Sequence, residues 1–280
     1  RSDGDNMSFT YTQLKTAIED YTENNETSFI TNLPLFIRLT EERILKNVQL
    51  SLFRKNVAGS MTASNKFLEV PSDFLAPFSL AFTDSDSDTT FVDYKDPEFV
   101  QTYTPNSSTT GAPRYYAMYD LNTFILGPTP NSSYATELHY FYRPESLTES
   151  TYTLTLTSVT GTFTASDTIT GGTSGESSGV TSVPSSTSLI VVIPSSNYTV
   201  GETITASPSG ATAVVSALGA DTTLTWLSEN AEMAMLYGSL SEAYLYMKGD
   251  PQTMQMYMQR FGEAAGRLKN LGEAQEVTDE

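Results

Sequence analysis

Apolar residues recur at helical spacing at both ends of the chain. A capping box at Thr10–Gln13 opens the first such stretch, and a second opens at Asn32 with Pro34 in its first turn, where a missing N–H costs little. Near the other end, Gly249-Asp250-Pro251 separates two apolar stripes by ending one helix and then capping and starting the next. The pattern predicts two N-terminal and two C-terminal helices. The C-terminal stripes consist of Met233, Leu236, Tyr237, Leu240, Tyr244 and Met247, and of Met254, Tyr257, Phe261, Ala264, Leu268 and Leu271.

Short segments rich in aromatic and β-branched residues follow the N-terminal helices. Clusters of Pro, Gly, Asn and Asp separate these segments, as turns require, so they predict a small antiparallel β-domain. A short helix at 96–103 is expected among the strands. The predicted strands are 56–62, 66–70, 78–82, 90–94, 114–119, 123–126 and 136–142.

The stretch from Thr151 to Thr225 differs from the rest of the chain in composition. It holds 33 Ser or Thr residues and no Lys or Arg. Within it, Phe163–Thr170 and Tyr198–Thr205 share an aromatic residue followed by an acid-Thr-Ile-Thr sequence, 35 residues apart. A Ser-Gly pair follows each copy at the same distance. Since threonine suits a pleated surface, we interpret 151–223 as an inserted β-domain of two repeats of about 35 residues, each a hairpin.

The fold class that follows is α+β. The segments 8–147 and 224–270 form one interrupted domain, a helical bundle with a small antiparallel β-domain, and the all-β domain is inserted into it. Residues 1–7 are interpreted as a polar leader. Residues 271–280 hold four acids and no base, and we expect them to be a mobile acidic tail.

Charge and residue usage exclude several classes of function. Fifteen basic and 33 acidic side chains give a net charge of −18, which opposes binding to DNA or to an anionic membrane. The chain has no Cys and one His, so thiolate sites are excluded and a Ser-His-Asp triad is disfavoured. The longest apolar run, Leu189–Ile193, is too short to span a bilayer, and we expect no signal peptide and no membrane.

Candidate chemistry is sparse. Asp84, Asp86 and Asp88 have the spacing of a calcium loop, but its glycine and closing Glu are missing, so a hairpin turn is favoured over a metal site. The Gly-rich segment 171–175 lacks a nearby cation, which favours a turn over a phosphate loop. His139 fits a strand or subunit-contact residue. We therefore expect no enzyme, catalytic residue, cofactor or metal.

Segments on both sides of the insertion resemble the head-to-tail adaptor proteins (head-completion, or tail tubular A-like) of tailed bacteriophages. The resemblance lies in the order of several segments along the chain rather than in one motif. These segments are Phe29-Ile30, Leu35–Ile44, Val70–Leu75, Gly111–Tyr116, Phe124–Pro130, Leu138–Pro144 and Thr225–Ala243.

This resemblance implies a virion structural protein of the neck or tail, assembled in the host cytoplasm. Such proteins form a ring, usually of twelve copies, between the portal protein and a tail nozzle or tail tube protein, and DNA passes through the channel without specific binding. By this resemblance 32–49 and Ser228–Lys248 make the ring wall. The predicted ring contacts are Phe36, Arg38, Arg43, Leu45, Tyr237 and Tyr244. The predicted portal-binding residues are Met254, Tyr257, Phe261, Leu268, Leu271, Glu273 and Glu276.

Two other functions stay open at the level of sequence. The inserted β-domain, which a plain adaptor does not need, could make the protein a virion decoration or tail-fibre-docking protein. A glycan-degrading virion enzyme would need a pair of carboxylates in a cleft, and no pair of acids flanked by aromatic residues suggests one.

Overall fold

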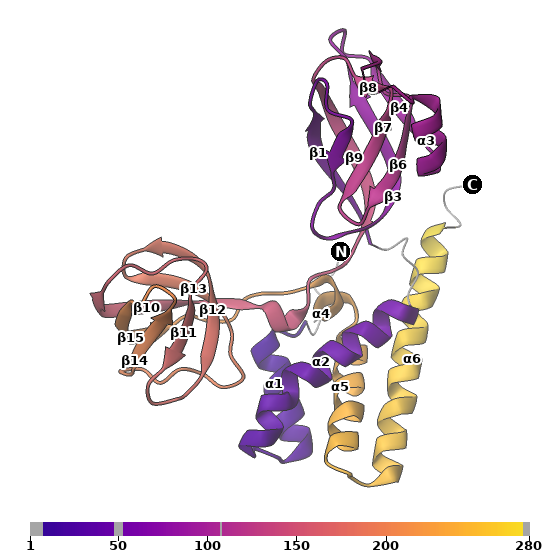
Figure 1. The fold of residues 1–280 in the computed structure, drawn as a ribbon. Coiled ribbons are helices and arrows are strands. Elements are labelled where there is room, and N and C mark those ends of the chain that lie inside the picture. Colours follow the sequence, from indigo (N-terminus) through magenta and orange to yellow (C-terminus); the bar gives the residue numbers. More distant parts are fainter. Residues whose placement is uncertain (1–7, 48–52, 107, 277–280) are drawn as a thin grey trace. The chain divides into compact units, whose positions relative to one another are not determined.

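The computed structural model describes residues 8–47, 53–106 and 108–276 of a mixed α+β protein (Figure 1). Contacts between residues divide the chain into two compact units. The sheet unit is residues 50–144, and the helical unit joins the N-terminal helices to the chain from Glu145 onward. The strands that the sequence assigned to one domain with the helices thus form a compact unit of their own.

The helical unit contains the chain's longer helices together with a β-barrel. Its α1 begins with the predicted capping box, in which the Thr10 side chain accepts from the Gln13 amide and the Gln13 side chain accepts from the Thr10 amide. The helices, including one 3-10 turn, are α1 (Tyr11–Thr22), α2 (Thr27–Asn47), η2 (Leu147–Glu149), α4 (Trp226–Asn230), α5 (Glu232–Tyr246) and α6 (Pro251–Glu276).

Helix α2 begins at Thr27, earlier than the predicted start at Asn32, so Pro34 lies inside the helix. A proline in a helix interior costs about 3 kcal/mol. The earlier start adds the completely buried Phe29 to the apolar side of the helix, and burying such a side chain stabilises a fold by roughly 1.5–3 kcal/mol. This burial offsets much of the cost of Pro34.

Helix α6 continues to Glu276, six residues into the segment expected to be a mobile tail. The structure describes only the backbone of residues 271–276, and residues 277–280 lie outside the described part of the chain. The acidic residues there do not end the helix, because Glu is a good helix former and a charged helix face needs no partner in water.

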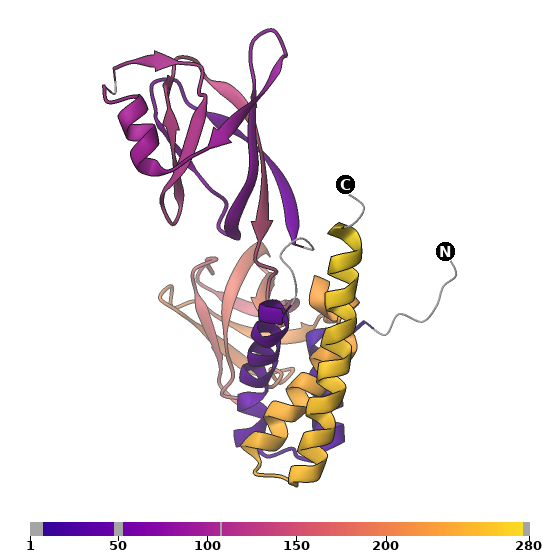
Figure 2. The ribbon, with the colours of Figure 1, turned by 90° about the vertical axis from the view of Figure 1, so that its right-hand side faces the viewer.

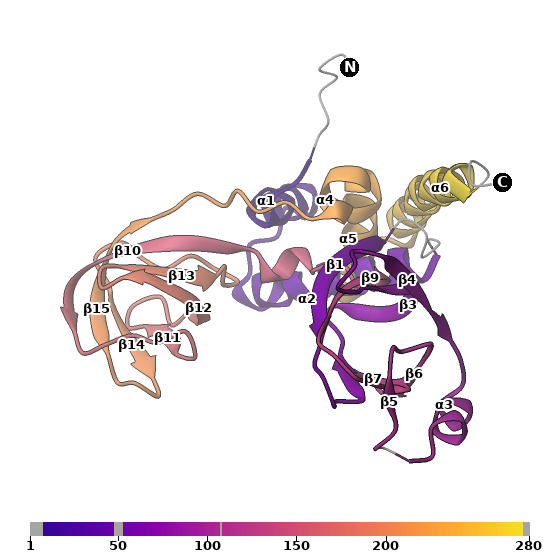
Figure 3. The ribbon, with the colours of Figure 1, turned by 90° about the horizontal axis from the view of Figure 1, so that it is seen from above.

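Helix α5 is the centre of the helical unit. Helices α1, α2 and α6 each pack against it, and the views from the front and from above show α1 and α6 on either side of it (Figures 1 and 3). Because three helices surround α5, most of its residues are buried and it shows no single apolar stripe.

The sheet unit is a seven-stranded sheet in the order β1-β9-β3-β4-β6-β7-β2. All seven predicted strands are present, and α3 (Pro97–Tyr103) is the predicted short helix, capped by Asp96 and packed on β6 and β7 (Figure 2). The sheet is not purely antiparallel, since β4 pairs with β6 in parallel. The strands, including a separate pair β5 and β8, are β1 (Arg54–Met61), β2 (Phe67–Glu69), β3 (Phe74–Thr83), β4 (Thr89–Tyr94), β5 (Thr110–Gly111), β6 (Tyr115–Asp120), β7 (Thr123–Gly127), β8 (Thr129–Pro130) and β9 (Tyr134–Tyr142).

The repeated segment forms a closed barrel in the order β10-β13-β12-β11-β14-β15. Each repeat supplies three strands rather than the expected hairpin of two, because β10 precedes the first copy of the motif and β13 precedes the second. The pairing is two-fold symmetric: Leu154 of β10 pairs with Leu189 of β13, its equivalent 35 residues later. The strands are β10 (Thr151–Thr160), β11 (Thr168–Gly171), β12 (Ser177–Ser185), β13 (Ser188–Val192), β14 (Thr203–Ser207) and β15 (Thr212–Leu218).

Candidate assembly surface

Three helices of the helical unit come close together at Gly238, in the middle of α5. A Cβ atom built on Gly238 would lie 2.3 Å from Cγ2 of Thr40 in α2 and 2.9 Å from Cδ2 of Phe261 in α6. Thr40 is completely buried and Phe261 is a buried ring, so neither can move aside. Glycine at this position therefore allows α2 and α6 to approach α5 and fixes the surfaces that the three helices present outward.

One partly exposed surface is a tyrosine patch, which we define as Tyr21 of α1, Tyr237 and Tyr244 of α5, and Tyr257 and Arg260 of α6. Tyr257 is the buried centre of this patch. The ring of Tyr257 stacks on Tyr237 at 6.2 Å and meets Tyr244 edge-on at 5.1 Å between centroids. Arg260 Nη1 donates to Tyr237 Oη at 2.9 Å, and its guanidinium lies 5.3 Å from the centre of that ring. Tyr21 is 51% exposed, so the patch faces solvent at its edge.

Electrostatics agree with this arrangement of the tyrosine patch. Burial, with smaller contributions from the phenols of Tyr244 and Tyr21, raises the pKa of Tyr257 to about 12. The hydrogen bond to Tyr237 raises the pKa of Arg260. At neutral pH the patch therefore contains the neutral phenol of Tyr257 and the cation of Arg260. Tyrosine and arginine are the residues that most often dominate the binding energy of protein interfaces.

A second outward surface is the leucine pair, Leu35 and Leu39, on α2. These two side chains are 50% and 37% exposed, while Phe36 and Ile37 between them and Thr40 after them are buried. The spacing i, i+4 places both leucines on the side of α2 that points away from the core. The leucine pair therefore leaves apolar surface open to solvent.

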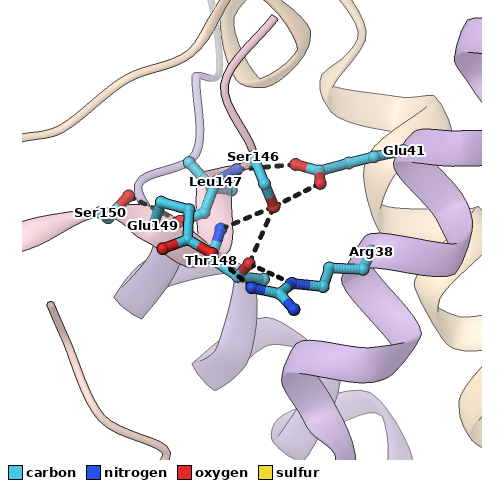
Figure 4. Close-up of polar contacts among 7 residues, drawn as sticks. All are labelled: Arg38, Glu41, Ser146, Leu147, Thr148, Glu149 and Ser150. Carbon is cyan, nitrogen blue, oxygen red and sulfur yellow. Dashed lines mark hydrogen bonds and ion pairs between the residues drawn. The ribbon is translucent and has the colours of Figure 1, made fainter. Parts of the chain in front are cut away.

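Polar contacts clamp α2 onto the segment that joins β9 to the barrel, as Figure 4 shows. The buried carboxylate of Glu41 accepts from the Leu147 amide at 2.7 Å and from Ser146 Oγ at 2.6 Å. Arg38 Nε donates to Thr148 Oγ1 at 2.9 Å, and the guanidinium pairs with Glu149. Arg38, a predicted ring contact, is thus used inside the subunit, although its side chain stays more than half exposed.

The other predicted ring contacts fall in different places. Phe36 is 3% exposed and packs on Phe29 and Tyr246, so its ring is used in the core and not, as expected, on a surface that meets another copy. Arg43 joins the helices, because its guanidinium lies 4.5 Å from the ring centre of Phe261 and pairs with Glu242 of α5 at 2.6 Å. Leu45 is half-buried.

The predicted portal-binding stripe of α6 faces inward for most of its length. Tyr257, Phe261 and Leu268 are buried at 5–6% exposure, and Met254 is half-buried. This difference arises because a stripe at helical spacing marks the side of a helix that is covered, and here α5 covers it. The side chains of Leu271, Glu273 and Glu276 lie outside the described part of the structure.

Of the residues on these two surfaces, the sequence singled out Tyr237, Tyr244 and Tyr257 but not Tyr21, Arg260 or the leucine pair. A signal for the leucines was present, since Leu35 and Leu39 interrupt the polar side of α2 at i, i+4 spacing. The role of Tyr21 and Arg260 had no such signal, because it depends on how α1 and α6 pack around α5.

The barrel uses its two repeated acids as structural acceptors. Asp167 of the first repeat accepts from the Thr164 amide at 2.7 Å and, at 2.7 Å and 3.0 Å, from the hydroxyl and amide of Ser209 in the second repeat. Burial alone would raise the pKa of Asp167, but these hydrogen bonds outweigh it and lower the pKa. Each repeat is therefore tied to the other through its acid.

Glu202 makes the reciprocal contacts. It accepts from Thr199 in its own repeat and from the amides of Thr173 and Ser174 in the first repeat, at 2.7–2.9 Å. As with Asp167, these donors outweigh burial and lower the pKa of the carboxyl. The Gly-rich segment 171–175 is thus a turn whose amides bind a carboxylate of the same chain.

Other candidate chemistry resolves into local structure. Asp84 Oδ1 accepts from the amides of Asp86 and Asp88 at 2.9 Å and 3.0 Å, which forms the hairpin turn between β3 and β4. His139 lies 3.3 Å from Glu137 Oε1 on the half-exposed face of β9. Within the described ranges, the His, Asp and Glu side chains form no group of three or more that could hold a metal ion.

The sheet unit also exposes aromatic side chains. Phe78 of β3 is 51% exposed and meets Phe141 of β9 edge-on, and the guanidinium of Arg54 lies 4.6 Å from the Phe78 ring centre. Phe91 of β4 is 69% exposed. Neither α3 nor the core of this unit covers them, so this face offers a further aromatic surface to a partner.

Comparison with known proteins gives one family match. A family model described as SU10 adaptor protein matches residues 9–169, which is more than half of the chain. The match runs from α1 through the sheet unit and into β11 of the barrel, and it does not extend to α5 or α6. No match was found among curated proteins. The helices of the described residues include none long and apolar enough to cross a membrane.

Proposed function

The chain belongs to the SU10 adaptor protein family, and on this premise we propose that it forms a head-to-tail connector ring between the portal protein and the next tail component. The family makes it a structural adaptor protein of a bacteriophage, a virion component that interacts with other head or tail components. The ring, its usual number of twelve copies and its position beneath the portal are the proposed part.

The observation that carries the ring is the pair of different outward surfaces on the helical unit. A closed ring of identical subunits needs two distinct faces that meet head to tail. The tyrosine patch and the leucine pair lie on different helices and differ in chemistry, aromatic and cationic against aliphatic. A protein that acted alone would gain nothing from exposing both.

Net charge supports the role of a passage for DNA. At −18 per copy, a ring repels phosphate from its inner wall, so DNA passes without being held. The phosphate contacts of DNA-binding proteins come mainly from Lys and Arg, and many of those described here are engaged within the chain, as Arg38, Arg43 and Arg260 are.

For portal binding we propose the C-terminal end of α6 together with the exposed residues of that helix. Tyr257, Phe261 and Leu268 hold α6 onto α5, which leaves Met256 and Met258, 42% and 46% exposed, for an outside partner. Methionine adapts its shape to irregular surfaces and is common at such contacts.

Native mass spectrometry tests this function directly. The full chain is mixed with assembled portal protein, and we expect a defined particle in which a ring of copies is bound to the portal. A chain ending at Asn270, without the last turns of α6, should bind portal more weakly while its circular dichroism stays helical. A single copy in solution with every head and tail component offered would contradict the proposal.

The alternative function, docking of a fibre or decoration through the barrel, has one feature against it. Among the described barrel residues, only one large apolar side chain, Val200, is more than one third exposed. The aromatic rings of Tyr152, Phe163 and Tyr198 are buried. The barrel surface is therefore poor in the residues that anchor protein interfaces.

Removing the barrel separates the two functions. Thr223 Oγ1 donates to the Thr151 carbonyl oxygen at 3.4 Å, so the two ends of the barrel segment are adjacent. A chain in which a short Gly-Ser linker replaces residues 152–222 should still form rings on the portal. If this chain kept its helices but no longer bound the portal, the barrel would be the part that carries the adaptor function.

A further inference from the structure

The tyrosine patch and the leucine pair are suited to each other. The patch offers the exposed ring of Tyr21, the half-buried rings of Tyr237 and Tyr244 and the guanidinium of Arg260, while α2 offers two partly exposed aliphatic side chains on one helix face. Aliphatic side chains pack well on aromatic faces, and the central contacts of interfaces commonly combine such residues.

Charge on the two surfaces is complementary as well. Glu42 follows Leu39 by one turn on the same side of α2, where its carboxylate also pairs with Lys46 at 2.7 Å. Arg260 is the cation of the tyrosine patch. Because each copy carries a net charge of −18, two copies meet most favourably where a cation of one faces an acid of the other.

We propose that Leu35 and Leu39 of one copy pack on the tyrosine patch of the next copy, with Glu42 of the first facing Arg260 of the second. The proposal rests on the ring of the proposed function and specifies which surfaces close it. The contact is heterologous: each copy uses its leucine pair towards one neighbour and its tyrosine patch towards the other. Contacts of this kind generate rings.

Disulfide cross-linking tests the contact, because the chain has no cysteine of its own. Leu39→Cys and Tyr21→Cys replace exposed side chains, so the fold should tolerate them. In rings assembled on the portal, the double variant should give a ladder of covalent multimers after oxidation. Each single variant should give no covalent multimers. Dimers from Leu39→Cys alone would indicate a symmetric contact, and intact rings of the double variant without cross-links would place the contact elsewhere. Either result overturns the proposal.

Complementary blocking is the second test. L35D/L39D destroys the leucine pair, and Y21D/R260E destroys the tyrosine patch, while each variant keeps the other surface. Neither variant should form rings on the portal. An equimolar mixture of the two variants in the absence of portal should give a one-to-one dimer, because one intact contact remains between them. Each variant alone should self-associate at least tenfold more weakly than the wild type.

The control for the blocking test is T12D/T16D, which adds the same two negative charges as L35D/L39D to the exposed side of α1 outside both surfaces. It should form rings as the wild type does. If all variants form rings of unchanged mass, the proposed contact is wrong and the connector function stands. If the wild type itself forms no ring on the portal, the connector function falls together with the contact.

Discussion

At the scale of single residues, Gly238 is the position on which the helical unit depends most. Gly238→Ala would place a methyl group 2.3 Å from Thr40 Cγ2 and within 3.0 Å of two ring atoms of Phe261. We expect a loss of about 1–3 kcal/mol in the free energy of unfolding, the usual cost of overpacking a core. Urea denaturation followed by the circular dichroism of the helices measures it.

Gly262→Ala in α6 is the matched control for this prediction. A Cβ atom built there meets no atom within 4 Å, and the residue lies in a helix. The change should stabilise the helix by roughly 0.5–1 kcal/mol, because alanine is a better helix former than glycine. Equal effects of the two substitutions would show that α2 and α6 do not approach α5 as closely as the structure has them.

The repeated acids of the barrel predict a dependence of its stability on pH. Asp167 and Glu202 have lowered pKa values in the folded barrel, so each stabilises the fold above the ordinary carboxyl pKa of about 4, and this contribution is lost as the pH falls through the folded values. We expect faster hydrogen exchange of barrel amides at pH 3 than at pH 6, after correction for the intrinsic rates.

Glu202→Gln isolates this contribution to the pH dependence. Glutamine keeps the shape but loses one acceptor oxygen and the charge, so the barrel should be weaker at pH 6 and change less on acidification. The amides of α5 in the same sample serve as an internal reference. A variant barrel as sensitive to acid as the wild type would assign the effect to other groups.

At the scale of elements, the clamp between α2 and η2 fixes the segment that leads into the barrel. Glu41→Gln removes one of the two acceptor oxygens that hold Ser146 and Leu147. Because a buried donor is left without its partner, we expect the free energy of unfolding to fall by about 1–3 kcal/mol. Local hydrogen exchange of residues 146–150 should rise accordingly. Glu42→Gln removes the exposed ion pair with Lys46 and should change the free energy of unfolding by less than about 0.5 kcal/mol.

Local signals in the sequence were sufficient for most elements. The capping box at Thr10, the capped helix α3 and the seven main strands appear where turn residues and alternation predicted them. These features depend on neighbours within a few residues. The α+β class followed from them.

The start of α2 and the end of α6 could not be predicted from neighbouring residues in the sequence. Pro34 argues for a helix start by itself, and the burial of Phe29, which packs on Tyr246 of α5, favours the longer helix. For the same reason an apolar stripe identified the covered side of α6 but could not tell α5 from an outside partner as the cover. The three-stranded repeat was missed because β10 and β13 do not share the motif that identified it.

At the scale of the whole molecule, assembly must overcome the repulsion between like-charged copies. Each copy carries −18, and a ring brings many of these charges within a short distance. Apolar contacts such as those of the leucine pair and the tyrosine patch do not weaken with salt, whereas repulsion between exposed charges is screened over about 10 Å at 0.1 M and about 3 Å at 1 M ionic strength. Salt should therefore favour the ring.

We expect self-association of the full chain, measured by sedimentation velocity, to strengthen as sodium chloride rises from roughly 50 mM to roughly 500 mM, where the screening length falls severalfold. The pair of Glu42 and Arg260 acts in the opposite direction, because salt weakens it, and R260Q should therefore respond to salt more steeply than the wild type. If association instead weakened with salt in both proteins, attraction between charges rather than burial of apolar side chains would hold the copies together. The leucine pair would then have no part in the ring, and L35D/L39D would assemble as the wild type does.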